Sequence, residues 1–119
     1  MNKQELGELL GEWLELWPAE VVWNGNKVRT DAKYCVNKMQ KFVAENPQYT
    51  KQTIFAATKL YLQEQESKGW EYTQQAHFFI EKRGFPSKLE AYCAQVLAEA
   101  SRPKSTLPPP VIDYTSDFI

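Results

Sequence analysis

Residues 32–62, AKYCVNKMQKFVAENPQYTKQTIFAATKLYL, carry two apolar stripes at helical spacing on either side of one short break. Apolar side chains three and four positions apart fall on one face of an α-helix, so each stripe predicts a helix with one buried face. The break lies at Asn46-Pro47, because proline disfavours helical geometry in the residue before it. Thr30 or Asp31 can cap the first helix, and the second helix follows Thr50. The stripes comprise Ala32, Cys35, Val36, Met39, Phe42 and Val43, and then Ile54, Ala57, Tyr61 and Leu62.

The same spacing predicts three further helices around this pair. ELGELLGEWLELWP, residues 5–18, has leucines and tryptophans on one face and ends at a proline. YTQQAHFFIEKRG, residues 72–84, ends at Gly84, which suits the position just after a helix. Ser87 and Glu90 have the spacing of a capping box and start a fifth helix that runs to about residue 100. The sequence therefore predicts an all-α fold of about five helices in a compact bundle.

A short polar turn interrupts two apolar runs between the first and second predicted helices. VVWNGNKVR, residues 21–29, places Asn24-Gly25 between them, and this dipeptide is typical of a two-residue β-hairpin. The arms are only about three residues long, and an isolated two-stranded ribbon is marginally stable. A small hairpin and a tight loop are both consistent with this pattern.

The composition changes after residue 100. The chain of 119 residues is long enough for one domain, which we place at residues 1–100. Residues 101–110, SRPKSTLPPP, hold four of the seven prolines and predict a stiff spacer with polyproline geometry. Residues 111–119, VIDYTSDFI, form a separate, apolar and acidic segment. No stretch has the length of a membrane span or the pattern of a signal peptide, so we expect an intracellular, cytoplasmic protein without membrane contact.

Groups suited to catalysis are few in this sequence. His77 is the only histidine, and one imidazole without a spaced partner specifies neither a metal site nor a mechanism. Cys35 and Cys93 both lie on apolar stripes, where a thiol behaves as a small hydrophobic group. The glycines form no phosphate-binding motif. We therefore expect a protein that is not an enzyme and has no catalytic residues, no metal and no cofactor.

Charge is distributed unevenly along the domain. Residues 1–23 hold one lysine and five glutamates, whereas residues 24–60 hold seven basic and two acidic side chains. A small helical DNA-binding regulator, with one of these helices in the major groove, is one interpretation of the basic region. A solvated face coated with lysine is the other, since the region has a single arginine and arginine makes most base contacts. The possible nucleic-acid contacts are Lys27, Arg29, Lys33, Lys38, Lys41 and Lys51.

Trp13 and Trp17 lie one turn apart on the first predicted helix. Two indoles on one face bring a large apolar area, which is typical of a core. The alternative is that this helix docks its aromatic face in a groove of a partner, for example as an inhibitor of a host protein.

The segment 111–119 ends in large apolar residues although it follows a proline spacer. A free polar tail gains nothing by exposing such residues. One interpretation is that the segment packs on its own domain. The other is that it is a docking peptide, held away from the domain by the spacer and captured in an apolar pocket with basic groups at its rim. The residues expected to bind are Ile112, Tyr114, Asp117, Phe118 and Ile119.

The motif DYTSDFI, residues 113–119, resembles the C-terminal sliding-clamp-binding peptides of phage proteins, among them the late-transcription coactivators of T4-like phages. The matching residues are Asp117, Phe118 and Ile119. Ser116 departs from that pattern, which prefers leucine, so Ile112 or Tyr114 would supply the extra anchor. The acidic and aromatic tails of single-stranded-DNA-binding proteins look similar, and the body resembles small helical proteins of tailed phages.

The likeness to the coactivators implies a small adaptor in the cytoplasm of a bacterial host. Its helical body would sit on RNA polymerase, and its tail would bind a sliding clamp on DNA. Linking two modest contacts raises the effective concentration of one partner near the other, so an adaptor of this kind needs no chemistry.

Overall fold

The computed structural model describes residues 2–100, and these form five helices and one two-stranded sheet. This confirms the predicted all-α fold. The spacer 101–110 and the docking segment with Ile112, Tyr114, Asp117, Phe118 and Ile119 lie outside the described residues. The elements are α1 (Lys3–Glu15), β1 (Val22–Trp23), β2 (Asn26–Lys27), α2 (Ala32–Glu45), α3 (Lys51–Ser67), α4 (Ala76–Ile80) and α5 (Lys88–Ala100).

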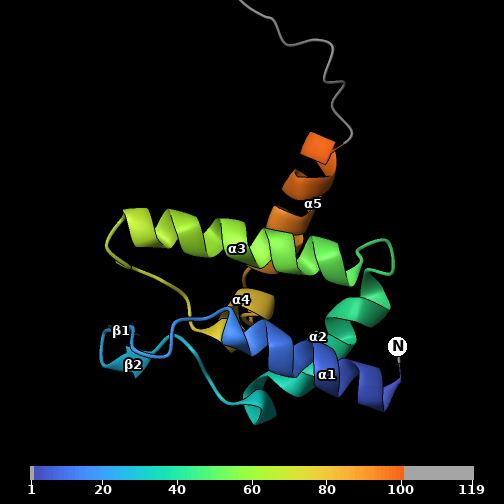
Figure 1. Ribbon diagram of the computed structural model, residues 1–119, viewed down its shortest axis with the longest axis horizontal. Coiled ribbons are helices and arrows are strands. Elements are labelled where there is room, and N and C mark those ends of the chain that lie inside the picture. The colour runs from blue at the N-terminus through green and yellow to red at the C-terminus, as the bar shows by residue number, and fades with distance from the viewer. Residues whose placement is uncertain (1, 101–119) are drawn as a thin grey trace, which may run out of the picture.

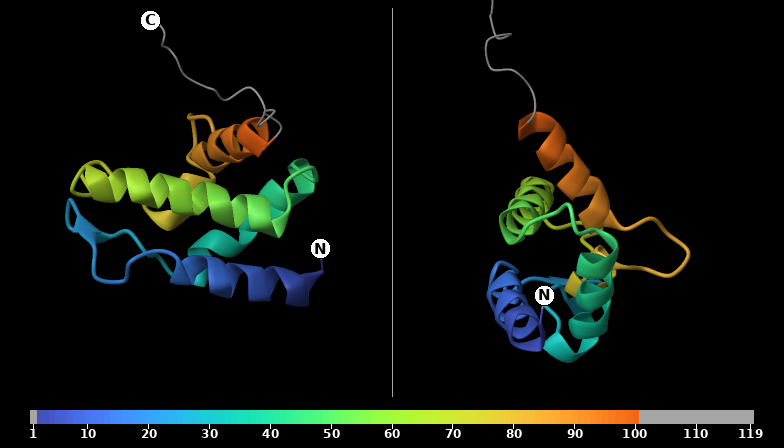
Figure 2. Two further views of the ribbon diagram at one scale, coloured as in Figure 1. Left: turned by 45° about the horizontal axis from the view of Figure 1, so that its top comes forward. Right: turned by 90° about the vertical axis from the view of Figure 1, so that its right-hand side faces the viewer.

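Three of the helices are stacked in layers, and the other two lie beside this stack. Figure 2 shows α1, α3 and α5 one above another in both views, with α2 and α4 beside them. In terms of contacts, α1 packs on α2, α2 on α4, α4 on α5, and α5 on α3. The short hairpin and the α3–α4 connection lie together at one end of the molecule, on the left in Figure 1.

The first three helices begin and end close to where the sequence predicts. Thr50 caps α3, because its Oγ1 accepts a hydrogen bond from the backbone N–H of Thr53 at 3.2 Å. Asn46 follows the last residue of α2, as its proline neighbour requires. Of the two alternatives for residues 21–29, the structure has the small hairpin. Its strands are two residues long, and Val22 lies opposite Lys27. Its turn residues, Asn24 and Gly25, both have positive φ, as a two-residue hairpin turn demands.

The fourth helix is much shorter than predicted. It covers residues 76–80 rather than 72–84, and the residues on either side depart from helical geometry. Tyr72 has φ of 60°, which breaks the helix before it starts, and Glu81 is extended. Gly84 has φ of 85° but sits in a separate turn, closed by a hydrogen bond from Phe85 N to Lys82 O at 3.0 Å. The prediction that Gly84 directly follows a helix is therefore wrong.

The start of α5 is confirmed in part. The Oγ of Ser87 accepts a hydrogen bond from the backbone N–H of Glu90 at 3.1 Å. The carboxylate of Glu90 instead accepts the hydroxyl of Tyr49 at 2.9 Å, from the loop between α2 and α3. This contact ties α5 to another part of the chain rather than closing a capping box. Within α5, Leu89 and Cys93 are buried, whereas Tyr92, Val96 and Leu97 are half-buried and Ala100 is exposed.

Aromatic side chains from α1, the residues just after it, α3 and α4 meet in the core. The rings of Trp17 and Trp13 lie 5.5 Å apart, those of Trp17 and Phe79 5.6 Å, and those of Tyr61 and Phe79 4.5 Å, measured between centroids. Trp13 and Trp17 are both 0% exposed. The interpretation of these tryptophans as core is therefore correct. The structure does not have the alternative arrangement, in which they face a partner, because Thr58 and Tyr61 of α3 and Phe79 of α4 contact the two buried indoles.

Candidate functional site

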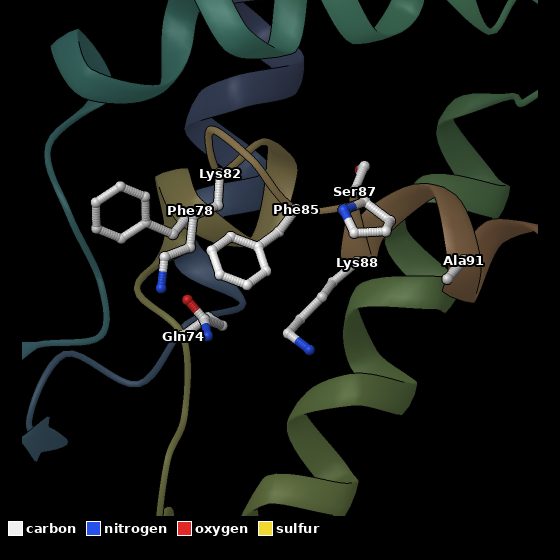
Figure 3. Close-up of a pocket in the computed structure, with 8 residues that line it drawn as sticks. Gln74, Phe78, Lys82, Phe85, Ser87, Lys88 and Ala91 are labelled. Carbon is white, nitrogen blue, oxygen red and sulfur yellow. The ribbon is translucent and has the colours of Figure 1, made fainter.

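An open groove lies where the turn before α5 meets α4. Its volume is about 380 Å³. Figure 3 shows the rings of Phe78 and Phe85 on the two sides of the Lys82 side chain, with Lys88 beyond Phe85. We call it the Phe78/Phe85 groove. Its lining residues are Gln74, Phe78, Lys82, Phe85, Pro86, Ser87, Lys88 and Ala91.

The local sequence explains why Phe85 stays outside the core. The turn around Gly84 reverses the chain, and Pro86 follows, so Phe85 cannot join either helix. Its side chain is 64% exposed. The Nζ of Lys82 lies 5.1 Å from the centroid of the Phe85 ring and 5.6 Å from that of Phe78. A cation between two aromatic faces holds both rings at one edge of the groove.

The groove is basic and apolar. Lys82 and Lys88 line it, and no carboxylate does. Within residues 2–100, neither lysine forms an ion pair. Glu81, the sequence neighbour of Lys82, pairs with Lys41 at 2.7 Å instead. The hydrogen bond from Lys41 lowers the pKa of the Glu81 carboxyl below its usual value. Two cations beside one exposed ring, that of Phe85, and one half-buried ring, that of Phe78, suit an acidic and aromatic ligand.

A second exposed apolar surface lies at the hairpin end of the molecule, and we call it the hairpin patch: Val22, Trp23 and Tyr72. Val22 is 53% exposed and Tyr72 is 77% exposed. The rings of Trp23 and Tyr72 meet edge to face, with centroids 5.1 Å apart. Tyr72 adopts a positive φ, which is uncommon for a bulky residue. Trp70, two residues earlier, has a positive φ as well, and strained positions of this kind concentrate at functional sites.

The six basic residues considered for nucleic acid do not form one free surface. Arg29 donates to the backbone carbonyl oxygens of Trp17 at 2.7 Å and Glu15 at 3.3 Å, so it completes the end of α1. Its role is structural. Among the lysines, Lys38 and Lys41 share one carboxylate, that of Glu81.

The remaining lysines of this set are separated by their contacts. Lys51 pairs with Glu12 of α1 at 2.7 Å. Lys33 lies 5.2 Å from the ring centroid of its neighbour Tyr34. Lys27 is exposed in β2. The contacts therefore favour the solvated, ion-paired interpretation of the basic region.

His77 lies on α4, and its side chain is half-buried. Its Nδ1 lies 3.1 Å from the hydroxyl oxygen of Thr30, and its ring centroid lies 4.1 Å from that of Phe78. Burial lowers the pKa of His77, and the charge of Lys38 lowers it further. No cluster of acidic, cysteine and histidine side chains within residues 2–100 could hold a metal ion.

We predict that His77 titrates with a midpoint below 6.5, its ordinary value. Since the folded protein binds this proton less readily than the unfolded chain, the contribution of His77 to stability is lost as pH falls below that value. One-dimensional proton NMR measures the midpoint directly, because the sequence has a single histidine. Lys38→Gln should raise the midpoint, whereas Lys33→Gln should leave it unchanged. A wild-type midpoint at or above 6.5 would contradict the structure.

The two thiols are enclosed in the core. Cys35 and Cys93 are both 0% exposed. Burial raises the pKa of the Cys93 thiol to about 12 and raises the pKa of Cys35 as well. A thiol that stays protonated is a poor nucleophile. These cysteines fill the core, as their positions on the apolar stripes predicted.

Neither exposed surface is predicted by the sequence patterns. The signal for the groove was present in KRGFPSK, residues 82–88, where an aromatic residue stands between a turn glycine and a proline with cations on both sides. Such a phenylalanine belongs to no helical stripe. The signal for the hairpin patch was weaker, because Tyr72 falls within the helix that the periodicity predicted.

No helix within residues 2–100 has both the length and the apolar content to cross a membrane. The sequence of the chain matches no protein-family model, no curated protein and no solved structure.

Proposed function

We propose that this chain is a non-enzymatic adaptor with two separate contacts. The segment 111–119 binds a sliding clamp, and the helical body binds RNA polymerase, as in a phage late-transcription coactivator. The support for the first contact is the residue pattern of the segment, acidic and aromatic after a proline spacer. The support for the second is the exposed hairpin patch, since apolar surface of this kind marks protein contacts.

The observation that carries the proposal is that the body completes its core without the segment. Trp13, Trp17 and Phe79 are each 0% exposed within a cluster made of residues from α1 to α5 and their connections. The large apolar side chains of residues 111–119 are therefore not needed to fill the interior. This leaves them available as a ligand for another surface.

Deleting residues 111–119 tests the first contact. We expect clamp binding to be lost and polymerase binding to be retained, because the deletion removes no side chain from the core. Binding to the purified clamp and to purified RNA polymerase is measured separately by calorimetry. Clamp binding that survives the deletion, or an intact chain that binds no clamp, would refute the proposal.

The matched variant for the body is Tyr72→Asn. Asparagine tolerates positive φ, so this change removes the exposed ring without adding backbone strain. It should weaken polymerase binding about tenfold or more, which is ~1.4 kcal/mol, and leave clamp binding unchanged. Tyr34→Ala, which removes another exposed tyrosine on α2, serves as the control. Equal effects of the two variants would exclude the hairpin patch as the polymerase contact.

A further inference from the structure

We propose that the segment 111–119 of the same molecule occupies the Phe78/Phe85 groove when no other partner holds it. The groove is then a resting site for the segment, and a clamp has to compete for the same side chains. This inference does not require that the partner be a clamp, because it concerns the segment and the body alone.

The apolar surface of the groove matches the apolar side chains of the segment. The groove offers two aromatic rings, of which Phe85 is 64% exposed, and a volume of about 380 Å³. Small apolar pockets of about 300 Å³ and above are the size that proteins use to hold compact ligands. One aromatic and one aliphatic side chain from Phe118 and Ile119 are suitable occupants. Ring against ring contact at this edge adds to the area that is buried.

The negative charge of the segment matches the positive charge of the groove. The segment contains Asp113 and Asp117 and no basic residue. The groove contains Lys82 and Lys88 and no carboxylate, and within residues 2–100 these lysines lack ion-pair partners. An acidic residue next to an aromatic one, as in Asp117-Phe118, can place its charge at the rim while the ring enters the groove.

The spacer is long enough to bring the segment back to the groove. The groove includes Lys88 and Ala91 from the first turn of α5, and the described chain ends at Ala100. A helix rises by 1.5 Å per residue, so the groove lies about 18 Å from that end. The spacer 101–110 spans about 31 Å if each residue extends by 3.1 Å. The spacer is therefore long enough for the segment to return to the groove of its own molecule.

A neighbouring depression shares Gln74 and Lys88 with the groove and leads toward the α3–α4 connection, where Glu71 and Tyr72 line it. A short linker gives an effective concentration near the millimolar range, so even a weak contact within one molecule is well occupied.

Occupancy of the groove lowers the affinity of the segment for any other partner. A ligand whose competent state is only partly populated binds with an affinity that is reduced by that fraction. Variants that empty the groove should therefore tighten binding of the segment to any partner that uses the same residues.

The test places a spin label on the intact chain at Ser116→Cys and records the amide signals of the body by NMR. The label goes to this cysteine because Cys35 and Cys93 are buried. We expect strong broadening at Phe85 and Ala91 and none in α1. The charge-reversed double variant Lys82→Glu, Lys88→Glu should abolish the broadening. Adding Asp113→Lys and Asp117→Lys to that variant should restore it.

Two controls make the outcome decisive. Lys33→Glu with Lys59→Glu changes the charge by the same amount away from the groove and should leave the broadening intact. A mixture of spin-labelled chain without ¹⁵N and unlabelled ¹⁵N chain reports contacts between molecules. Broadening that persists in this mixture, or that is absent from the groove in the intact chain, would overturn the proposal. No clamp is present, so the result is independent of the proposed function.

Discussion

Replacing Trp13 or Trp17 by alanine is expected to lower the free energy of unfolding by about 3–5 kcal/mol. Both side chains are 0% exposed and touch the other aromatic rings of the core, so each substitution leaves a large cavity. A domain of this size is stabilised by only about 5–15 kcal/mol in total, so either change removes a large part of the stability. Urea unfolding followed by circular dichroism measures the loss.

Phenylalanine variants distinguish the two tryptophans. The indole N–H of Trp13 donates to the hydroxyl oxygen of Thr58 at 2.8 Å, and Trp13→Phe removes that hydrogen bond. The indole Nε1 of Trp17 is buried and has no acceptor among residues 2–100. Trp17→Phe removes an unpaired donor, whose burial costs about 1–3 kcal/mol, and this offsets part of the lost packing. Trp17→Phe should therefore be the milder change.

The exposed residue Tyr72 provides the comparison, since Tyr72→Asn should change stability by less than either alanine substitution. The opposite pattern would restore the idea that α1 docks its aromatic face on a partner. In that case the alanine variants would unfold at nearly the same urea concentration as the wild type and would lose binding to a partner protein.

Arg29→Met is expected to lower the free energy of unfolding by about 2 kcal/mol. Hydrogen bonds to charged groups contribute roughly 1.5–3 kcal/mol, and Arg29 makes two of them to backbone carbonyls at the end of α1. The positive charge also interacts favourably with the negative end of the helix dipole. Because the side chain is partly exposed, we place the effect near the lower part of this range. The same urea unfolding measurement applies.

Two further substitutions test this structural role. Arg29→Lys keeps the charge but lacks the forked donors, so it should recover only part of the stability. Lys33→Met, at an exposed position of the same basic region, should change stability by less than about 0.5 kcal/mol. If Arg29 served nucleic acid instead, Arg29→Met would leave unfolding unchanged and weaken DNA binding in a strongly salt-dependent way.

The helices could be predicted wherever their stability depends on near neighbours in the chain. The stripe of α2, the start of α3 after Thr50 and the Asn24-Gly25 turn each depend on interactions between residues no more than four positions apart. The helix predicted for residues 72–84 was too long because its periodicity ignored the backbone of the α3–α4 connection. There, Gly69, Trp70 and Tyr72 all adopt positive φ, which no apolar pattern reveals.

The candidate sites were less predictable than the helices. Arg29 belongs to a basic region by composition, yet the structure uses it to cap a helix that ends more than ten residues earlier. Lys41 pairs with Glu81, forty positions away. Contacts of this separation depend on how α1, α2 and α4 pack, so no local pattern could assign them.

By itself the sequence determined the helical class, most of the helix ends and the Asn24-Gly25 turn, because hydrophobic periodicity, caps and turns act over a few residues; it left a small hairpin and a tight loop both open. Tertiary structure alone decided that the two tryptophans are core, that most of the basic side chains are engaged, and that Phe78 and Phe85 share an open groove beside Lys82 and Lys88. These features depend on which segments the burial of apolar surface brings together, and that is a property of the whole packed chain.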